Sequence, residues 1–170
     1  MGTCKPSGQA GGTKMFHEDD FLRLWKGLYY CLWMQDKPLL QEELTSNICN
    51  LIECFASHSE QTLLWIFCFY KTLSREWYGI DRWRMDKFLM LMRKFLRRQL
   101  EWLNAEPQPM NLIDRSLLIW KEAILANGKS NTDFVIPEGV KFHFASVFLD
   151  EVDFVYGSTV RTSILLINCS

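Results

Sequence analysis

Residues 81–106 read DRWRMDKFLMLMRKFLRRQLEWLNAE, and this stretch decides the fold. Its large apolar residues recur every three or four positions, a spacing that places them on one face of an α-helix. Asp81 is a suitable N-cap for this helix, and Pro107 and Pro109 end it. The apolar positions are Met85, Phe88, Met92, Phe95, Leu96 and Trp102.

The same spacing recurs on both sides of this stretch and predicts five further helices. The acidic residues 18–20 precede the first, where carboxylates meet the positive end of a helix dipole. Pro38 marks the start of the second helix. Ser57 and Glu60 have capping-box spacing, which predicts a third helix beginning near His58. The five stripes cover Phe21–Leu32, Leu40–Phe55, Leu63–Trp77, Ile113–Ile124 and Val140–Val152.

The connections between these stripes are short and carry no β-hairpin signal. Short connections make consecutive helices antiparallel. We therefore predict an all-α fold of antiparallel helix pairs stacked as a HEAT-like α-solenoid, with a compact helical bundle as the alternative. Along the chain we expect a flexible Gly-rich leader over 1–16 and a helical-repeat domain over 17–155, with a polar loop at 127–138. The divergent segment 156–170 is expected to be disordered, unless it pairs with something else.

Composition limits the functions open to the chain. It has 170 residues, of which 48% are hydrophobic, enough to bury the core of one domain. The longest apolar run, 63–70, is far shorter than the roughly 20 residues of a membrane span. The six cysteines contain no C-x-x-C pair and the three histidines no H-E-x-x-H motif, so we expect no metal. Because no nucleophile motif or phosphate-binding glycine loop occurs, we expect no enzyme, no cofactor and no small-molecule substrate.

Positive charge is concentrated in one region. The formal net charge is −1, yet residues 71–98 hold nine basic residues against three acidic ones, a local net charge of +6. Around the predicted helix, the cations of residues 87–98 lie away from the apolar stripe and predict a basic outer face. Such a face can neutralise the phosphates of RNA, and arginine favours bidentate contact. Three aromatic residues, Trp77, Tyr78 and Trp83, flank this region and can stack on unpaired bases.

The candidate RNA- or partner-binding residues are Arg75, Trp77, Arg82, Arg84, Lys87, Arg93, Lys94, Arg97 and Arg98. Two other interpretations stay open at this point. The face can instead dock an acidic protein surface, or it can be a solvated face without a partner. The residues alone do not decide among the three.

Three stretches of the chain resemble the ribosomal RNA processing protein 1 family. The first, LWKGLYYCLWMQDKPLLQEEL, covers residues 24–44. The second begins with REWYGIDR at residues 75–82 and continues to Arg93. The third is GVKFHF at residues 139–144, followed by LDEV at residues 149–152. Together these stretches span most of the predicted helical domain.

The resemblance implies a non-catalytic nucleolar assembly factor that assists maturation of ribosomal RNA precursors towards the large subunit. The partners it implies are the pre-ribosomal particle, the RNA precursor and other assembly factors. Family members begin with another helical stretch where this chain has its Gly-rich leader, and they continue into a Lys/Arg-rich tail. The chain thus resembles a shortened or alternatively ended form. Without that basic tail, we expect weaker targeting to the nucleus and nucleolus.

Overall fold

The protein was analysed as a computed structural model that describes residues 15–105, 110–121, 124 and 136–168. Within these residues the chain forms six α-helices and two short 3-10 helices, and it contains no strand, which confirms the all-α prediction. The elements in order are α1 (Glu18–Met34), α2 (Pro38–Asn50), η1 (Leu51–Phe55), α3 (Ser59–Glu76), η2 (Trp77–Gly79), α4 (Met85–Asn104), α5 (Met110–Trp120) and α6 (Glu138–Asn168).

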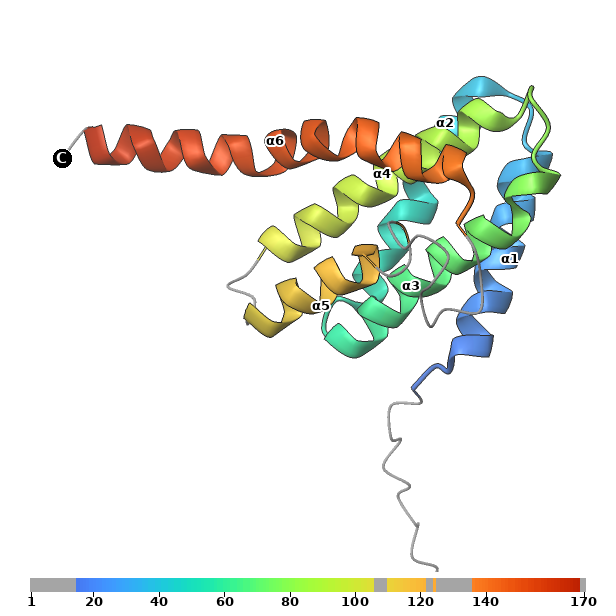
Figure 1. The fold of residues 1–170 in the computed structure, drawn as a ribbon, viewed down its shortest axis with the longest axis horizontal. Coiled ribbons are helices and arrows are strands. Elements are labelled where there is room, and N and C mark those ends of the chain that lie inside the picture. Colours follow the sequence, from blue (N-terminus) through green and yellow to red (C-terminus); the bar gives the residue numbers. More distant parts are fainter. Residues whose placement is uncertain (1–14, 106–109, 122–123, 125–135, 169–170) are drawn as a thin grey trace, which may run out of the picture.

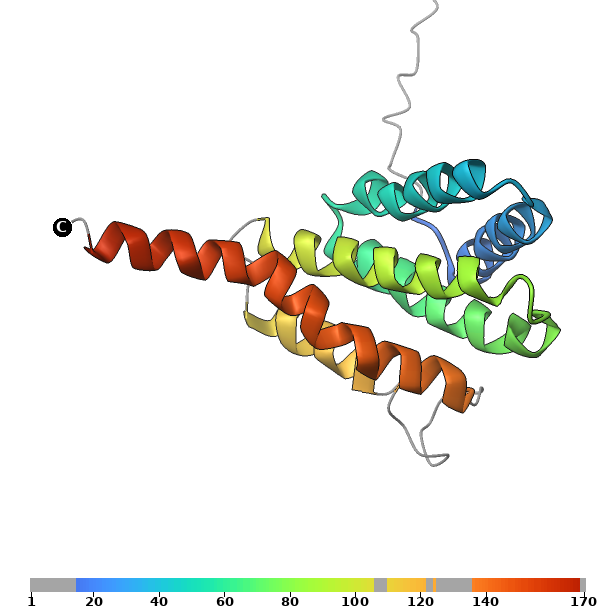
Figure 2. The ribbon, with the colours of Figure 1, turned by 90° about the horizontal axis from the view of Figure 1, so that it is seen from above.

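The helices pack in two layers, each made of alternate helices along the chain (Figures 1 and 2). One layer contains α1, α3 and α5, and the other contains α2, α4 and α6. Helix α4 is central in its layer, with α2 on one side and α6 on the other. Both a solenoid of stacked helix pairs and a compact bundle can contain such layers, so the layers do not distinguish between these two folds. That choice stays a prediction.

Aromatic rings fill the core between the layers. Trp25 of α1 stacks on Trp65 of α3, with ring centroids 4.2 Å apart, and its indole N–H donates to the Trp65 carbonyl oxygen over 3.0 Å. Gln99 of α4 lies buried between Tyr70 of α3 and Trp120 of α5. Its amide oxygen accepts from the Trp120 indole N–H over 2.9 Å, and its amide nitrogen donates to the Tyr70 hydroxyl over 3.2 Å. One polar side chain therefore joins three helices inside the core.

Several predicted helix starts differ from the observed ones. Proline begins α2 as predicted. The predicted capping box of Ser57 does not form, because its hydroxyl bonds the His58 ring, and α3 begins at Ser59. Asp81 does not cap α4 directly. Its carboxylate accepts from the Arg84 backbone N–H over 3.0 Å in a separate turn, and α4 begins at Met85.

The predicted division into a leader, a helical domain and a tail stays a prediction, but the contacts of Phe16 and the length of α6 bear on its limits. Phe16 already belongs to the packed body, since its ring stacks on Phe21 and its N–H donates to the Gln61 amide oxygen. Helix α6 continues to Asn168 and extends past the other helices, where the sequence predicted disorder from residue 156 (Figures 1 and 2). A formed helix gains one hydrogen bond per added residue, so it can propagate without a new apolar stripe. Residues 1–14 of the leader and 125–135 of the predicted loop lie outside the described residues.

Candidate functional site

The nine candidate residues do not form one exposed basic face. Six of them lie on α4 or directly before it and contact neighbouring helices or the α1–α2 turn; these are Arg84, Lys87, Arg93, Lys94, Arg97 and Arg98. The other three, Arg75, Trp77 and Arg82, lie around the α3–α4 connection.

Two arginines of α4 hold a buried carboxylate of α6. The Glu151 side chain has no exposed surface, and it accepts from Arg93 Nε and Arg97 Nε, each over 2.5 Å. Arg97 Nη2 adds a third bond of 3.1 Å, and its guanidinium lies 4.0 Å above the Phe154 ring centroid. Burial raises the pKa of Glu151, but the hydrogen bonds from Arg97 and Arg93 outweigh this effect, so the pKa is below its usual value. The contact joins α4 to α6.

Lys94 and Arg98 lie on the other flank of α4, where they contact the α2–η1 segment. Lys94 Nζ lies 3.3 Å from a Glu42 carboxylate oxygen. Arg98 donates to the Asn50 amide oxygen over 2.8 Å and pairs with Glu53 over 3.1 Å. The two glutamates are mostly exposed, so each pair contributes only about 0–1 kcal/mol. Both cations are nevertheless compensated within the chain.

Arg84 and Lys87, at the N-terminal end of α4, contact the turn between α1 and α2. Lys87 is buried, and its ammonium donates to the carbonyl oxygens of Trp33 over 2.8 Å and Gln35 over 2.7 Å. Burial lowers the pKa of Lys87. Arg84 donates to the same Trp33 oxygen over 3.2 Å, lies over the Trp33 ring and pairs with Asp81. A positive charge is favourable there because α1 ends with unpaired carbonyl groups.

The predicted basic face is therefore a set of contacts between helices. The helical wheel placed residues 87, 93, 94, 97 and 98 away from the apolar stripe, but α4 is the middle helix of its layer, so both of its flanks meet other helices and Lys87 is buried. Cations that already bond carboxylates and carbonyls have less free charge to offer to phosphates. Binding of RNA or a partner by these six residues stays a prediction.

The remaining three candidates differ in exposure, because Trp77 is partly buried and the two arginines are exposed. Trp77 is partly buried, and its ring packs against the first turn of α6, only 3.2 Å from where a Cβ on Gly139 would lie. Arg75 and Arg82 are exposed, and neither has an ion-pair partner among the residues that the structure describes. These two arginines therefore keep their charge available.

A second basic surface, which the sequence anticipated only in part, lies where α1 meets the end of α3 and continues onto the α3–α4 connection. The sequence had pointed to Arg75, Tyr78, Arg82 and Trp83, and the structure adds Arg23, Lys26 and Tyr30. We call it the α1–α3 edge and define it by Arg23, Lys26, Tyr30, Arg75, Tyr78, Arg82 and Trp83. Arg23, Lys26 and Arg75 line one shallow groove, together with Asp19 and Glu76. The sequence does place residues 23, 26 and 30 on one face of α1. Their nearness to Arg75 follows only from the packing of α1 on α3.

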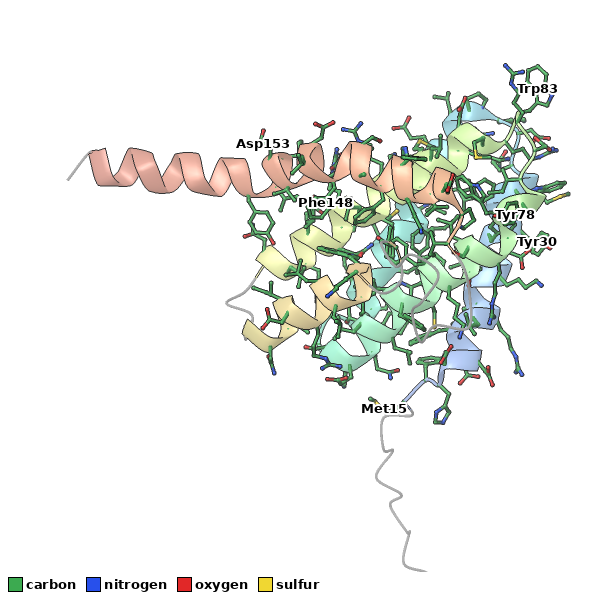
Figure 3. All side chains as sticks on the ribbon, viewed as in Figure 1. Met15, Tyr30, Tyr78, Trp83, Phe148 and Asp153 are labelled. Carbon is green, nitrogen blue, oxygen red and sulfur yellow. The ribbon has the colours of Figure 1, made fainter. Side chains whose placement is uncertain are left out.

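Exposed aromatic rings continue this edge (Figure 3). Tyr78 is 83% exposed and Trp83 is 91% exposed, while Tyr30 is about half-exposed. The Tyr30 hydroxyl donates to a Glu76 carboxylate oxygen over 3.4 Å, which ties the ring to the end of α3. Figure 3 shows Tyr30, Tyr78 and Trp83 at the same end of the molecule.

No histidine or carboxylate cluster among the described residues suggests catalysis or metal binding. His143 contacts the Leu89 carbonyl oxygen over 3.0 Å, and burial lowers its pKa. In the described part of the chain, no three His, Cys, Asp or Glu side chains are grouped so that they could hold a metal ion. No described helix is both long and apolar enough to cross a lipid bilayer.

Comparison with known proteins matches this helical body to one family. The family described as nucleolar protein Nop52 matches residues 7–166. The ribosomal RNA processing protein 1 homolog of Caenorhabditis elegans is 43% identical over 148 residues, which are 87% of this chain and 36% of the relative. Homolog A of Homo sapiens is 43% identical over 143 residues, 84% of this chain and 29% of the relative. Homolog B of Homo sapiens is 40% identical over 156 residues, 91% and 19% respectively. The chain thus spans about a third or less of the length of these relatives.

Proposed function

We propose, from the premise that this chain belongs to the Nop52 family of nucleolar proteins, that it is a non-catalytic helical scaffold in ribosomal RNA processing. The observation that carries the proposal is the family match over residues 7–166, which includes every described helix up to the last turn of α6. Its curated relatives are named as ribosomal RNA processing proteins. The proposed partner is a precursor of the large ribosomal subunit, and the proposed location is the nucleolus.

The structure supports a scaffold through how its polar side chains are used. Glu151, Lys87 and Gln99 are buried, and each is held by partners in other helices or turns. These groups therefore stabilise the packing of the helices and do not converge on a shared pocket. A rigid helical body of this kind acts by presenting surfaces to partners.

A second candidate is a scaffold that binds only protein. It is favoured by an apolar groove between α1 and η1, whose lining includes Leu24, Leu28, Leu51 and Phe55. Gly27 lies in this groove and has open space above its backbone, which allows a partner to approach closely. Grooves of this type accept the apolar face of an amphipathic helix.

Association with precursor particles tests the proposal. We would express the tagged 170-residue chain in cells of its source organism, separate particles on a sucrose gradient, and probe the purified fractions for large-subunit RNA precursors. We expect the chain to co-sediment with those precursors. A chain that stays at the top of the gradient and purifies without them would contradict the proposed function.

A further inference from the structure

We propose that the α1–α3 edge binds single-stranded RNA, with its aromatic rings stacking on bases and its free cations contacting phosphates. The proposal rests on the proposed function and names both the partner class and the surface. It keeps Arg75 and Arg82 from the predicted set, replaces the cations of α4 by Arg23 and Lys26 of α1, and so centres the RNA contact where α1 packs on the end of α3.

The cations of this edge are available, unlike those of α4. Arg23, Arg75 and Arg82 are exposed and have no ion-pair partner among the described residues. Lys26 is largely exposed and lies 3.4 Å from Glu76, a distance typical of a weak surface pair. Each phosphate that such a cation neutralises releases counterions, which makes the affinity depend on salt.

The aromatic rings of this edge have no evident role in the core. Trp83 and Tyr78 leave nearly all of their surface in solvent, although an indole ring is among the most favourable groups to bury. Both rings sit on the short connection between α3 and α4, which also carries Arg82. A platform of flat rings bordered by arginines suits unpaired bases, because every base has a face that can stack.

Single-stranded RNA fits this surface better than a duplex does. The bases of a duplex are already stacked, so they are not free to stack on Trp83 and Tyr78. Arginine, tyrosine and tryptophan also recur at protein–protein interfaces, so an acidic protein is the competing partner that the crosslinking test below distinguishes. The edge also carries two acids, Asp19 and Glu76, and Glu76 is engaged by Lys26 and by the Tyr30 hydroxyl. The edge therefore keeps a positive balance within a chain whose net charge is −1.

The first test measures binding of the full chain to a fluorescent single-stranded RNA of about 15 nucleotides by anisotropy. The double variant Tyr78→Ala/Trp83→Ala removes two stacking platforms and should weaken binding about tenfold or more. The matched control is Phe142→Ala/Leu149→Ala, which removes two exposed apolar side chains of α6 and should leave binding unchanged. Circular dichroism should show all three proteins equally folded. Equal affinity of the edge variant and the wild type would overturn the proposal.

The second test separates phosphate contact from stacking. The variant Arg23→Glu/Arg75→Glu should lower the slope of log affinity against log salt by about 1.4, since each single-strand phosphate contact contributes about 0.7. An exposed lysine outside the edge, changed in Lys121→Glu, should alter the slope by less than half as much. A duplex of the same length should bind the wild type at least about tenfold more weakly. Equal duplex binding, or an unchanged slope for Arg23→Glu/Arg75→Glu, would contradict the assignment.

Ultraviolet crosslinking in cells distinguishes this inference from the proposed function. Adducts on Tyr30, Tyr78 or Trp83 in chain purified with precursor particles support both. A chain that co-sediments with the particles but crosslinks only to protein through these residues overturns the RNA inference and leaves the proposed function standing. A chain that binds RNA through this edge in vitro but never joins the particles contradicts the proposed function alone.

Discussion

Replacing Glu151 by glutamine should destabilise the fold far more than replacing an exposed carboxylate of α6 would. The carboxylate has no exposed surface and accepts three hydrogen bonds from two guanidiniums. Hydrogen bonds to charged groups contribute about 1.5–3 kcal/mol each, but glutamine keeps one acceptor oxygen and the arginines are partly exposed to water. We therefore expect Glu151→Gln to lower the free energy of unfolding by about 2–3 kcal/mol. The melting temperature should fall by about 4–12 °C.

Urea unfolding followed by tryptophan fluorescence measures this change, with the m-value checked for constancy. The control is Asp150→Asn, because Asp150 is 66% exposed and lies 3.7 Å from the same Arg93. That variant should change stability by less than about 0.5 kcal/mol. Because the pKa of Glu151 is lowered in the folded state, its contribution is present above its unfolded pKa and is lost as pH falls through the folded value. The difference in unfolding free energy between the wild type and Glu151→Gln should therefore disappear below about pH 4. If both variants unfold like the wild type at pH 7, the reasoning about this clamp is wrong.

Three further outcomes follow from the buried polar groups. Gln99→Leu leaves the Trp120 indole N–H without its acceptor and should cost about 2–4 kcal/mol in urea unfolding; a loss under about 0.5 kcal/mol would contradict the network. Lys87→Met removes the donor to two carbonyl oxygens of the α1–α2 turn and should lower the free energy of unfolding by about 1–2 kcal/mol. The urea midpoint should fall; an unchanged midpoint would show that the ammonium does not stabilise the turn. Burial raises the pKa of Cys49 and Cys68 to about 12, so a thiol reagent at pH 8 followed by peptide mass mapping should find both unmodified in the native protein. Among the four described cysteines, Cys31 and Cys54 are exposed and should react first.

The sequence predicted helices well because apolar spacing is a local signal. Pro38 gives the start of α2 directly, since its fixed φ suits a first turn. The start of α4 was placed too early because Asp81 can bond backbone N–H groups in a turn as well as at a helix end. The length of α6 was missed because residues beyond 155 have no apolar period, although the backbone there is helical.

The candidate site was harder to predict because its electrostatics depend on distant residues. Arg97 follows a helical wheel to the outside of α4, yet its partner Glu151 is 54 positions away. Arg93 meets the same carboxylate across 58 positions. No local pattern shows that a neighbouring helix will cover those flanks. Arg75 was among the candidate residues and is exposed, but its association with Arg23 required the packing of α1 on α3.

The arrangement of alternate helices in layers also bears on how the chain acquires its fold. The helices of each layer contact the helix two places further along the chain, so the side-chain contacts on the two flanks of α4 span 45–58 residues. A chain with such distant contacts must close large loops before burial rewards them, which slows folding compared with simple helical hairpins. During synthesis, the guanidiniums of Arg93 and Arg97 stay solvated until α6, which carries Glu151, has been made.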